Sequence, residues 1–149
     1  MYAHILIATD GSELATKGVQ HGLSLAVALK SRVTFVNATE PFPGFGLGDP
    51  MANYAATDSF NDYQQEGVRF AEQVLGKCKA AAEEVGLDAD TVHVDMVRAA
   101  EAIIETAKKR DCDLIVMASH GRRGLGRLFL GSQTIEVLSY SDIPVLVVR

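Results

Sequence analysis

Short apolar runs alternate with amphipathic stretches along the chain. Five runs have the length and composition of strands: His4–Thr9, Arg32–Ala38, Thr91–Val97, Asp113–Ala118 and Pro144–Arg149. The first, fourth and fifth runs are almost wholly apolar, which is typical of strands that are covered on both faces. The pattern therefore predicts a buried sheet.

Between these runs, apolar residues recur at the three- and four-residue spacing of helices. This spacing predicts helices from Leu14 to about Lys30, over Phe60–Val85, around Ala100–Ala107 and over Ser132–Tyr140. Asp10 and Glu13 resemble a capping box before the first of these helices. Gly86 follows the second helix as a stop signal.

A long loop is predicted between the second strand and the second helix. It covers Thr39–Ser59 and contains Pro41, Pro43, Pro50, Gly44, Gly46 and Gly48. Proline and glycine at this density indicate a loop. Loops of this length in compact domains often serve as lids or are disordered.

Strands that alternate with helices predict an α/β fold, a doubly wound parallel sheet with helices on both faces. A chain of 149 residues that is 48% hydrophobic suits one domain over residues 1–149. Such sheets bind ligands beyond the carboxyl ends of the strands, where the strand order reverses. The loops Thr9–Ser12 and Ala118–Ser132 follow the first and fourth strands, so they face one crevice if these strands are neighbours.

Composition narrows the classes of function. The net charge of −5 argues against a general affinity for nucleic acid. No apolar run approaches the ~20 residues of a membrane helix, and the first residues lack the features of a signal peptide. Cys78 and Cys112 are expected to be buried thiols in a reducing compartment. His4, His21 and His93 are scattered, which argues against zinc. We therefore expect a cytoplasmic protein.

The stretch Met117–Thr134 (MASHGRRGLGRLFLGSQT) predicts an anion site. A strand ends there, a basic loop follows, and a helix begins at Gly131 and Ser132. Gly121 and Gly131 allow backbone amides to approach a ligand. A helix start leaves amides unpaired at the positive end of the dipole. Positive charge comes from Arg122, Arg123 and Arg127. We interpret the segment as a phosphate cradle.

Three segments together resemble the universal stress protein family. They are the opening ILIATDGSELA, the segment DLIVMASHGRRGLGRLFLGS and the ending IPVLVVR, and they span nearly the whole chain. The resemblance implies a five-stranded parallel sheet of order 3-2-1-4-5. It also implies a homodimer, which in this family often forms through the last strand.

One branch of this family binds ATP through the pattern G-x2-G-x9-G-[ST]. Gly121, Gly131 and Ser132 match its later positions, whereas Ala118 stands where the first glycine is expected. The resemblance implies that Asp10 lies by the adenine and ribose, and that the end of the second strand offers backbone groups to adenine. Together with the interpretation of the basic loop, this predicts a site for ATP, ADP or AMP with Mg²⁺ formed by Ala8, Thr9, Asp10, Ala38, Met117, Ala118, His120, Gly121, Arg122, Arg123, Gly131, Ser132, Gln133 and Thr134.

Several of these residues have a second interpretation. Asp10 can simply cap the first helix, and Gly131 with Ser132 can form an ordinary turn and helix start. His120 can be a structural hydrogen-bonding group. Gly126-x4-Gly131-Ser132 imitates the spacing of a P-loop, but Ser132 and Gln133 stand where that motif needs Lys-[ST], so we do not expect a P-loop.

Three functions follow. The first is a dimeric stress-response sensor or regulator that binds an adenine nucleotide. The second is a slow phosphohydrolase, for which His120 and Asp10 are the only candidate bases; we find no positioned base or nucleophile. The third is a dimeric interaction module without nucleotide, which Ala118 favours. In each case Pro144–Arg149 is predicted to pair with its own copy, because a terminal apolar edge strand invites pairing.

Overall fold

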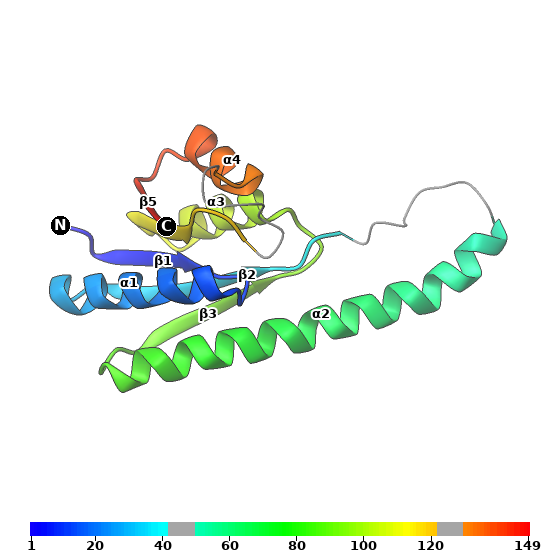
Figure 1. Cartoon of the computed structure of the whole chain (residues 1–149), viewed down its shortest axis with the longest axis horizontal. Coiled ribbons are helices and arrows are strands. Elements are labelled where there is room, and N and C mark those ends of the chain that lie inside the picture. Colours follow the sequence, from blue (N-terminus) through cyan, green and yellow to red (C-terminus); the bar gives the residue numbers. More distant parts are fainter. Residues whose placement is uncertain (42–49, 122–129) are drawn as a thin grey trace.

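A five-stranded parallel sheet forms the centre of the molecule (Figure 1). The computed structural model describes residues 1–41, 50–121 and 130–149, with residues 50–57 described by their backbone alone. The strands lie in the order β3-β2-β1-β4-β5, and every pairing is parallel. This confirms the expected order. The strands are β1 (His4–Ala8), β2 (Arg32–Ala38), β3 (Ala89–Val94), β4 (Leu114–Ala118) and β5 (Val145–Val148).

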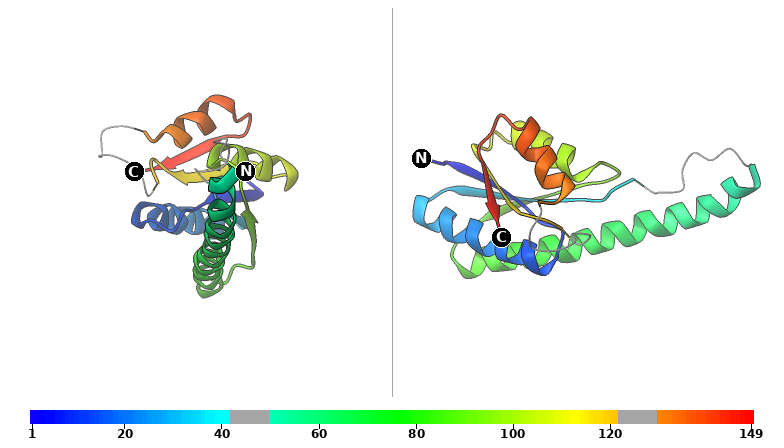
Figure 2. Two further views of the ribbon diagram at one scale, coloured as in Figure 1. Left: turned by 90° about the vertical axis from the view of Figure 1, so that its right-hand side faces the viewer. Right: turned by 45° about the horizontal axis from the view of Figure 1, so that its top comes forward.

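Helices cover both faces of the sheet, as predicted (Figure 2). Their bounds are α1 (Glu13–Leu29), α2 (Pro50–Glu84), α3 (Ala99–Lys109) and α4 (Ser132–Tyr140). Helices α1 and α2 pack on one face, and α3 and α4 pack on the other. Among the described residues no helix is both long and apolar enough to cross a bilayer.

Alternation along β1 builds both halves of the core. Ile5 and Ile7 point toward α1 and α2, whereas Leu6 and Ala8 point toward α3 and α4. Successive strand residues face opposite sides of a sheet, so a strand covered twice must be apolar throughout. Ile5, Leu6 and Ile7 are 0% exposed, which explains why this run contains no polar side chain between its ends.

The predicted loop over Thr39–Ser59 is wrong in its second half. Helix α2 begins at Pro50, ten residues before the predicted start at Phe60. Proline suits the first turn of a helix because the amide that it lacks would have no intrahelical partner there. The alanines that follow favour a helix. Residues 42–49 lie outside the described residues. Figure 1 shows the amino-terminal part of α2 extending well past the end of the sheet.

The third strand also differs from its prediction. β3 covers Ala89–Val94, whereas the alternation suggested Thr91–Val97. Met96 lies just beyond the strand with a φ of 59°, a left-handed conformation that ends an extended strand. Because the hydrophobic alternation in the sequence continues through this turn, the predicted strand extends beyond the observed one.

Both cysteines are buried in the core, as predicted. Cys78 belongs to the cluster under α1 and α2, and Cys112 to the cluster under α3 and α4. Burial raises the pKa of each thiol to about 11. The thiolate is the reactive form of cysteine, so neither side chain is a nucleophile in the folded protein.

We expect both thiols to react slowly with a disulfide reagent such as DTNB at pH 8. The raised pKa leaves roughly a hundredfold less thiolate than an exposed cysteine has, and burial blocks access. The rate in native protein should therefore be at least about a hundredfold below that in guanidinium chloride. Fast reaction of either thiol under native conditions would contradict this placement.

Candidate functional site

Two loops that are far apart in the sequence leave the sheet side by side. β1 pairs with β4, with Ile7 opposite Val116. The chain leaves β1 for α1 on one face of the sheet, and it reaches α4 on the other face after β4. The strand order reverses at this point, which is where α/β sheets bind ligands. The loops Thr9–Ser12 and Ala118–Gly121 therefore lie side by side at this edge of the sheet, where the sequence predicted a crevice between Thr9–Ser12 and Ala118–Ser132.

The Asp10 carboxylate lies directly against Gly121. A Cβ atom added at Gly121 would collide with Asp10 Oδ2, so only glycine allows this approach. Asp10 Oδ1 accepts a hydrogen bond from the Ser12 amide at 3.0 Å. Ser12 in turn caps α1, because its Oγ accepts from the Ala15 amide at 3.1 Å. The capping box predicted at Asp10 and Glu13 is therefore wrong, because the N-cap residue of α1 is Ser12. Asp10 contributes only by accepting a hydrogen bond from the Ser12 amide.

Helix α2 holds the loop that carries Asp10. Gly11 has a φ of +77°, and a Cβ atom there would lie 2.7 Å from Val74 Cγ2 and 3.2 Å from Phe70 Cζ. Position 11 therefore requires glycine for both its conformation and its packing. The carbonyl of Thr9, which is buried, accepts from Asn37 Nδ2 at 2.9 Å. The turn after β1 is fixed before any ligand arrives.

The backbone of Ala38 faces the crevice. The pairing of β1 with β2 ends where Ala8 lies opposite Val36. The Thr39 amide donates to Val94 O, and its carbonyl accepts from the Val97 amide, so Thr39 faces β3. Backbone groups of successive strand residues point to opposite neighbours. The N–H and C=O of Ala38 therefore point beyond the end of β1, where a donor and an acceptor together can bind a planar base.

The end of β4 is tied closely to the start of α4. Met117 and Ala118 are buried within β4. The Ser119 amide donates to Val148 O, and its carbonyl accepts from the Gly131 amide, both at 2.8 Å. Thr134, 2% exposed, donates its hydroxyl toward Ala118 O and Ser119 O at 3.2 and 3.0 Å. These hydrogen bonds join the end of β4 to the start of α4.

Gly131 permits a close packing of backbones. Its φ is −63°, which any residue adopts, but a Cβ atom would lie 3.2 Å from His120 Cα. His120 Nδ1 lies 3.3 Å from Ser119 Oγ as a hydrogen-bond partner. The sequence predicted Gly131 as a position where the backbone approaches a ligand, and among the described residues the groups that lie close to it are those of Ser119 and His120. Arg122 and Arg123 lie outside the described residues.

The first turn of α4 presents unpaired amides. The helix begins at Ser132, and Gly131 provides no side-chain cap. Within the described ranges no group accepts a hydrogen bond from the amides of Ser132, Gln133 or Thr134. Such amides, at the positive end of the helix dipole, bind anions. The Ser132 side chain is exposed beside them.

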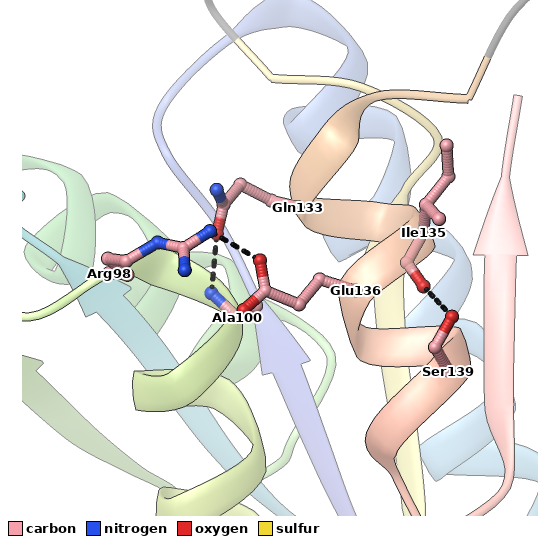
Figure 3. A network of polar contacts seen from close by, with 6 residues as sticks. All are labelled: Arg98, Ala100, Gln133, Ile135, Glu136 and Ser139. Atoms are coloured by element: carbon pink, nitrogen blue, oxygen red, sulfur yellow. Dashed lines mark hydrogen bonds and ion pairs between the residues drawn. The ribbon is translucent and has the colours of Figure 1, made fainter.

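The side chain of Gln133 serves a different purpose. Its Oε1 accepts a hydrogen bond from the Ala100 amide at 2.8 Å, in the first turn of α3 (Figure 3). One turn further along α4, Glu136 forms an ion pair with Arg98 at 2.5 Å (Figure 3). Helix α4 is therefore joined to α3 at two points. The sequence could not reveal this link, because it depends on how two helices pack.

Metal coordination has little support from side chains. Over residues 1–41, 58–121 and 130–149, no group of three His, Cys, Asp or Glu side chains could hold a metal ion. The arrangement offers backbone donors for an anion and one carboxylate, Asp10.

The fold and the site define a doubly wound α/β protein in which, among the described residues, the amides at the start of α4 have no partner beside the switch point of the sheet. The chain belongs to the universal stress protein family, whose model matches residues 1–149. A universal stress protein of Thermus aquaticus is 34% identical over 149 residues, covering 100% of both chains. One of Methanocaldococcus jannaschii is 32% identical over 149 residues, covering 100% of this chain and 83% of the relative.

Solved structures agree with this assignment. A structure of a hypothetical protein, a second M. jannaschii relative, superposes with a TM-score of 0.78 at 27% identity, covering 99% of this chain and 96% of that one. A universal stress protein in complex with cAMP gives a TM-score of 0.72 at 21% identity, with coverage of 99% and 97%. One from Archaeoglobus fulgidus in complex with dAMP gives 0.70 at 17% identity, with coverage of 99% and 98%. The last two show the shared fold.

Substitution of Gly11 tests how firmly the loop is held. Gly11→Ala should lower the free energy of unfolding by roughly 2–4 kcal/mol, because alanine adds a left-handed strain and a clash with Val74. Gly86→Ala is the matched control, since Gly86 has the same φ of +77° but nothing within 4 Å of an added Cβ atom. That variant should lose only about 1–2 kcal/mol. Equal losses in denaturant unfolding would show that Val74 does not press on the loop.

Proposed function

We propose that the protein binds an adenine nucleotide in the crevice between the loops Thr9–Ser12 and Ala118–Gly121. On this proposal it acts as a dimeric sensor or regulator in a cytoplasmic stress response. The observation that carries the proposal is that the amides of Ser132, Gln133 and Thr134, at the start of α4, have no acceptor among the described residues. These amides follow the loop that leaves the sheet at its switch point. An anion is the ligand that such amides bind best.

Each part of a nucleotide has a matching group in the crevice. The outward-facing N–H and C=O of Ala38 suit the edge of adenine, beside the wall formed by Ala8 and Thr9. The Asp10 carboxylate is an acceptor for ribose hydroxyls. The phosphates would lie on the amides of residues 132–134, with the Ser132 hydroxyl as a further donor and with charge from Arg122 and Arg123.

A magnesium ion would enter with the nucleotide. Mg²⁺ retains several waters and is usually held by one or two carboxylates together with phosphate oxygens. The described side chains include no set of three metal ligands, so phosphate oxygens would supply most of the coordination. We therefore propose Mg-ATP as the first ligand to test, with ADP and AMP beside it.

Two relatives support an adenine nucleotide in particular. Their structures contain cAMP and dAMP, which share an adenine and a phosphate and differ in the sugar and the phosphate linkage. Those shared groups are the ones for which this crevice has partners, at Ala38 and at the start of α4. The choice between ATP, ADP and AMP then depends on how many phosphates the loop after β4 holds.

We propose a binding protein in preference to an enzyme. Of the two candidate bases, His120 Nδ1 is bonded to Ser119 Oγ. Asp10 Oδ1 accepts from the Ser12 amide. These contacts hold both side chains within their own loops, whereas the phosphates are proposed to lie on the amides of residues 132–134, so we assign neither side chain the role of general base. Hydrolysis on this geometry would be slow at most.

The dimer would form along the open edge of β5. Among the described strands β5 pairs only with β4. The carbonyls of Pro144 and Val148 accept hydrogen bonds from β4. By alternation, the backbone groups of Val145 and Val147 point away from the sheet. An exposed edge of this kind pairs antiparallel with its own copy about a two-fold axis. Leu146 of the same strand and Leu138 of α4 are exposed beside it.

Replacement of Ser132 tests the amide site without unfolding it. Ser132→Pro removes one amide and the hydroxyl at a helix position that favours proline, and the extended conformation of Gly131 is compatible with a following proline. Ser132→Ala removes the hydroxyl alone. In calorimetric titration with Mg-ATP, alanine should weaken binding by about 0.5–1.5 kcal/mol, and proline should cost at least about 1 kcal/mol more.

Thermal unfolding without nucleotide is the control for both variants and should change little. Wild-type affinity in Ser132→Pro would place the phosphates elsewhere. Absence of heat from the unmodified protein at millimolar Mg-ATP would exclude nucleotide binding and leave the dimeric interaction module.

Replacement of Val147 tests the dimer edge. Val147→Pro removes an amide that faces away from β4, and proline is tolerated on edge strands. We expect a monomer in sedimentation analysis, with the far-ultraviolet circular dichroism of the parent. Val147→Ala keeps the amide and should remain dimeric. A dimeric Val147→Pro variant would show that the subunits meet elsewhere.

A further inference from the structure

A groove runs between α3 and α4, on the face of the sheet away from α1 and α2. Its lining consists of Glu101, Ile104, Glu105 and Lys108 of α3 with Glu136 and Tyr140 of α4. Its volume is about 260 Å³, below the ~300–1,000 Å³ of pockets that hold small-molecule ligands. The groove therefore suits one or two long side chains better than a cofactor.

The charges of the groove are unbalanced. At one end Arg98 pairs with Glu136, and at the other Lys108 Nζ lies 3.9 Å from Asp142 Oδ2. The ion pair of Lys108 is thus with Asp142 and not with Glu105. Within the described residues neither Glu101 nor Glu105 forms an ion pair. Carboxylates four residues apart repel each other on a helix, so a cation between them would relieve the repulsion.

An aromatic ring stands beside this pair of carboxylates. Tyr140 is 71% exposed, an unusual state for a large aromatic side chain. Ile104, which is buried, forms the apolar base of the groove. A guanidinium group is planar, donates to carboxylates in a fork and stacks on aromatic faces. Two carboxylates, an aromatic ring and an apolar base thus complement an arginine side chain better than a lysine one.

We propose that this groove docks an arginine-bearing segment of a partner protein, with Glu101 and Glu105 receiving the guanidinium and Tyr140 stacking on it. The second copy of the chain is proposed to bind at the open edge of β5, and no residue of β5 lines the groove. The proposal does not require a nucleotide in the crevice. Helix α4 nevertheless contributes to both proposed sites. Its first turn offers the amides proposed to bind phosphate, and its Glu136 and Tyr140 line the groove.

The test is fluorescence anisotropy at low ionic strength with a labelled peptide of alternating glycine and arginine. Its citrulline analogue, which keeps the shape of arginine without the charge, is the control peptide. The charge-neutralising pair Glu101→Gln with Glu105→Gln is compared with Glu83→Gln and Glu84→Gln, an exposed pair on α2 with the same change in net charge. The groove pair should weaken the arginine peptide about tenfold, and the α2 pair less than about twofold.

Tyr140→Leu supplies a second readout. It should weaken the arginine peptide about threefold and leave a lysine peptide nearly unchanged, because stacking favours guanidinium. Equal weakening by both glutamate pairs would reduce the binding to attraction between net charges, and equal binding of the citrulline peptide would show that the guanidinium charge is not recognised. Either result would overturn the proposal. Dissociation of the dimer by the groove pair would also overturn it, since the groove would then face a second copy.

The same titration with Ser132→Pro separates this proposal from nucleotide binding. Peptide affinity should be unchanged in that variant, whatever happens to Mg-ATP. A loss of peptide binding there would show that the peptide occupies the crevice, and it would overturn the groove as the docking site.

Discussion

Parallel pairing of β1 with β4 brings the Asp10 loop against the loop that begins at Ala118, and the candidate site depends on that contact. The approach is so close that Gly121 cannot carry a side chain beside the Asp10 carboxylate. Helix α2 presses on the same loop from the other side through Val74. The loop that carries Asp10 is therefore held by packing on two sides, and on the proposal above a ligand beside it would need little rearrangement of the described chain. Binding to a formed site avoids the cost of ordering loops.

The groups that face the crevice are mainly backbone groups. Ala38 contributes an amide and a carbonyl, and the first turn of α4 contributes three amides. Several side chains that the resemblance placed at the ligand are used inside the protein. Gln133 accepts from α3, and Thr134 bonds to the end of β4. These two residues fix the position of α4, whose first amides are the proposed phosphate-binding groups.

Much of the fold could be predicted because its strands obey a strong constraint. A strand covered on both faces must be apolar, and β1 and β4 show this without ambiguity. The start of α4 was predicted at Ser132 because a strand, a glycine-containing loop and a helical pattern follow one another there. The start of α2 was missed because Pro50 has two opposite meanings, as a loop residue and as the first residue of a helix. The sequence alone does not distinguish these two roles of proline.

The contacts within the site were harder to predict, for a physical reason. A glycine motif indicates that another group packs close to the backbone, but it does not indicate which group. At Gly121 the neighbour is the Asp10 carboxylate, and at Gly131 it is the backbone of His120. Both contacts join segments that meet only after the sheet has formed.

Ala118 illustrates the same point from the opposite direction. It stands where the family pattern has glycine, yet it is a buried residue of β4, and its carbonyl accepts from Thr134. The local geometry is set by that hydrogen bond and by the pairing of Ser119 with Val148. A methyl group in the strand leaves the amides at the start of α4 unpaired, and those amides carry the proposed chemistry. On the proposal above, the departure from the pattern therefore bears on the fit of a sugar against the end of β4, while the amides of Ser132, Gln133 and Thr134 still have no acceptor among the described residues.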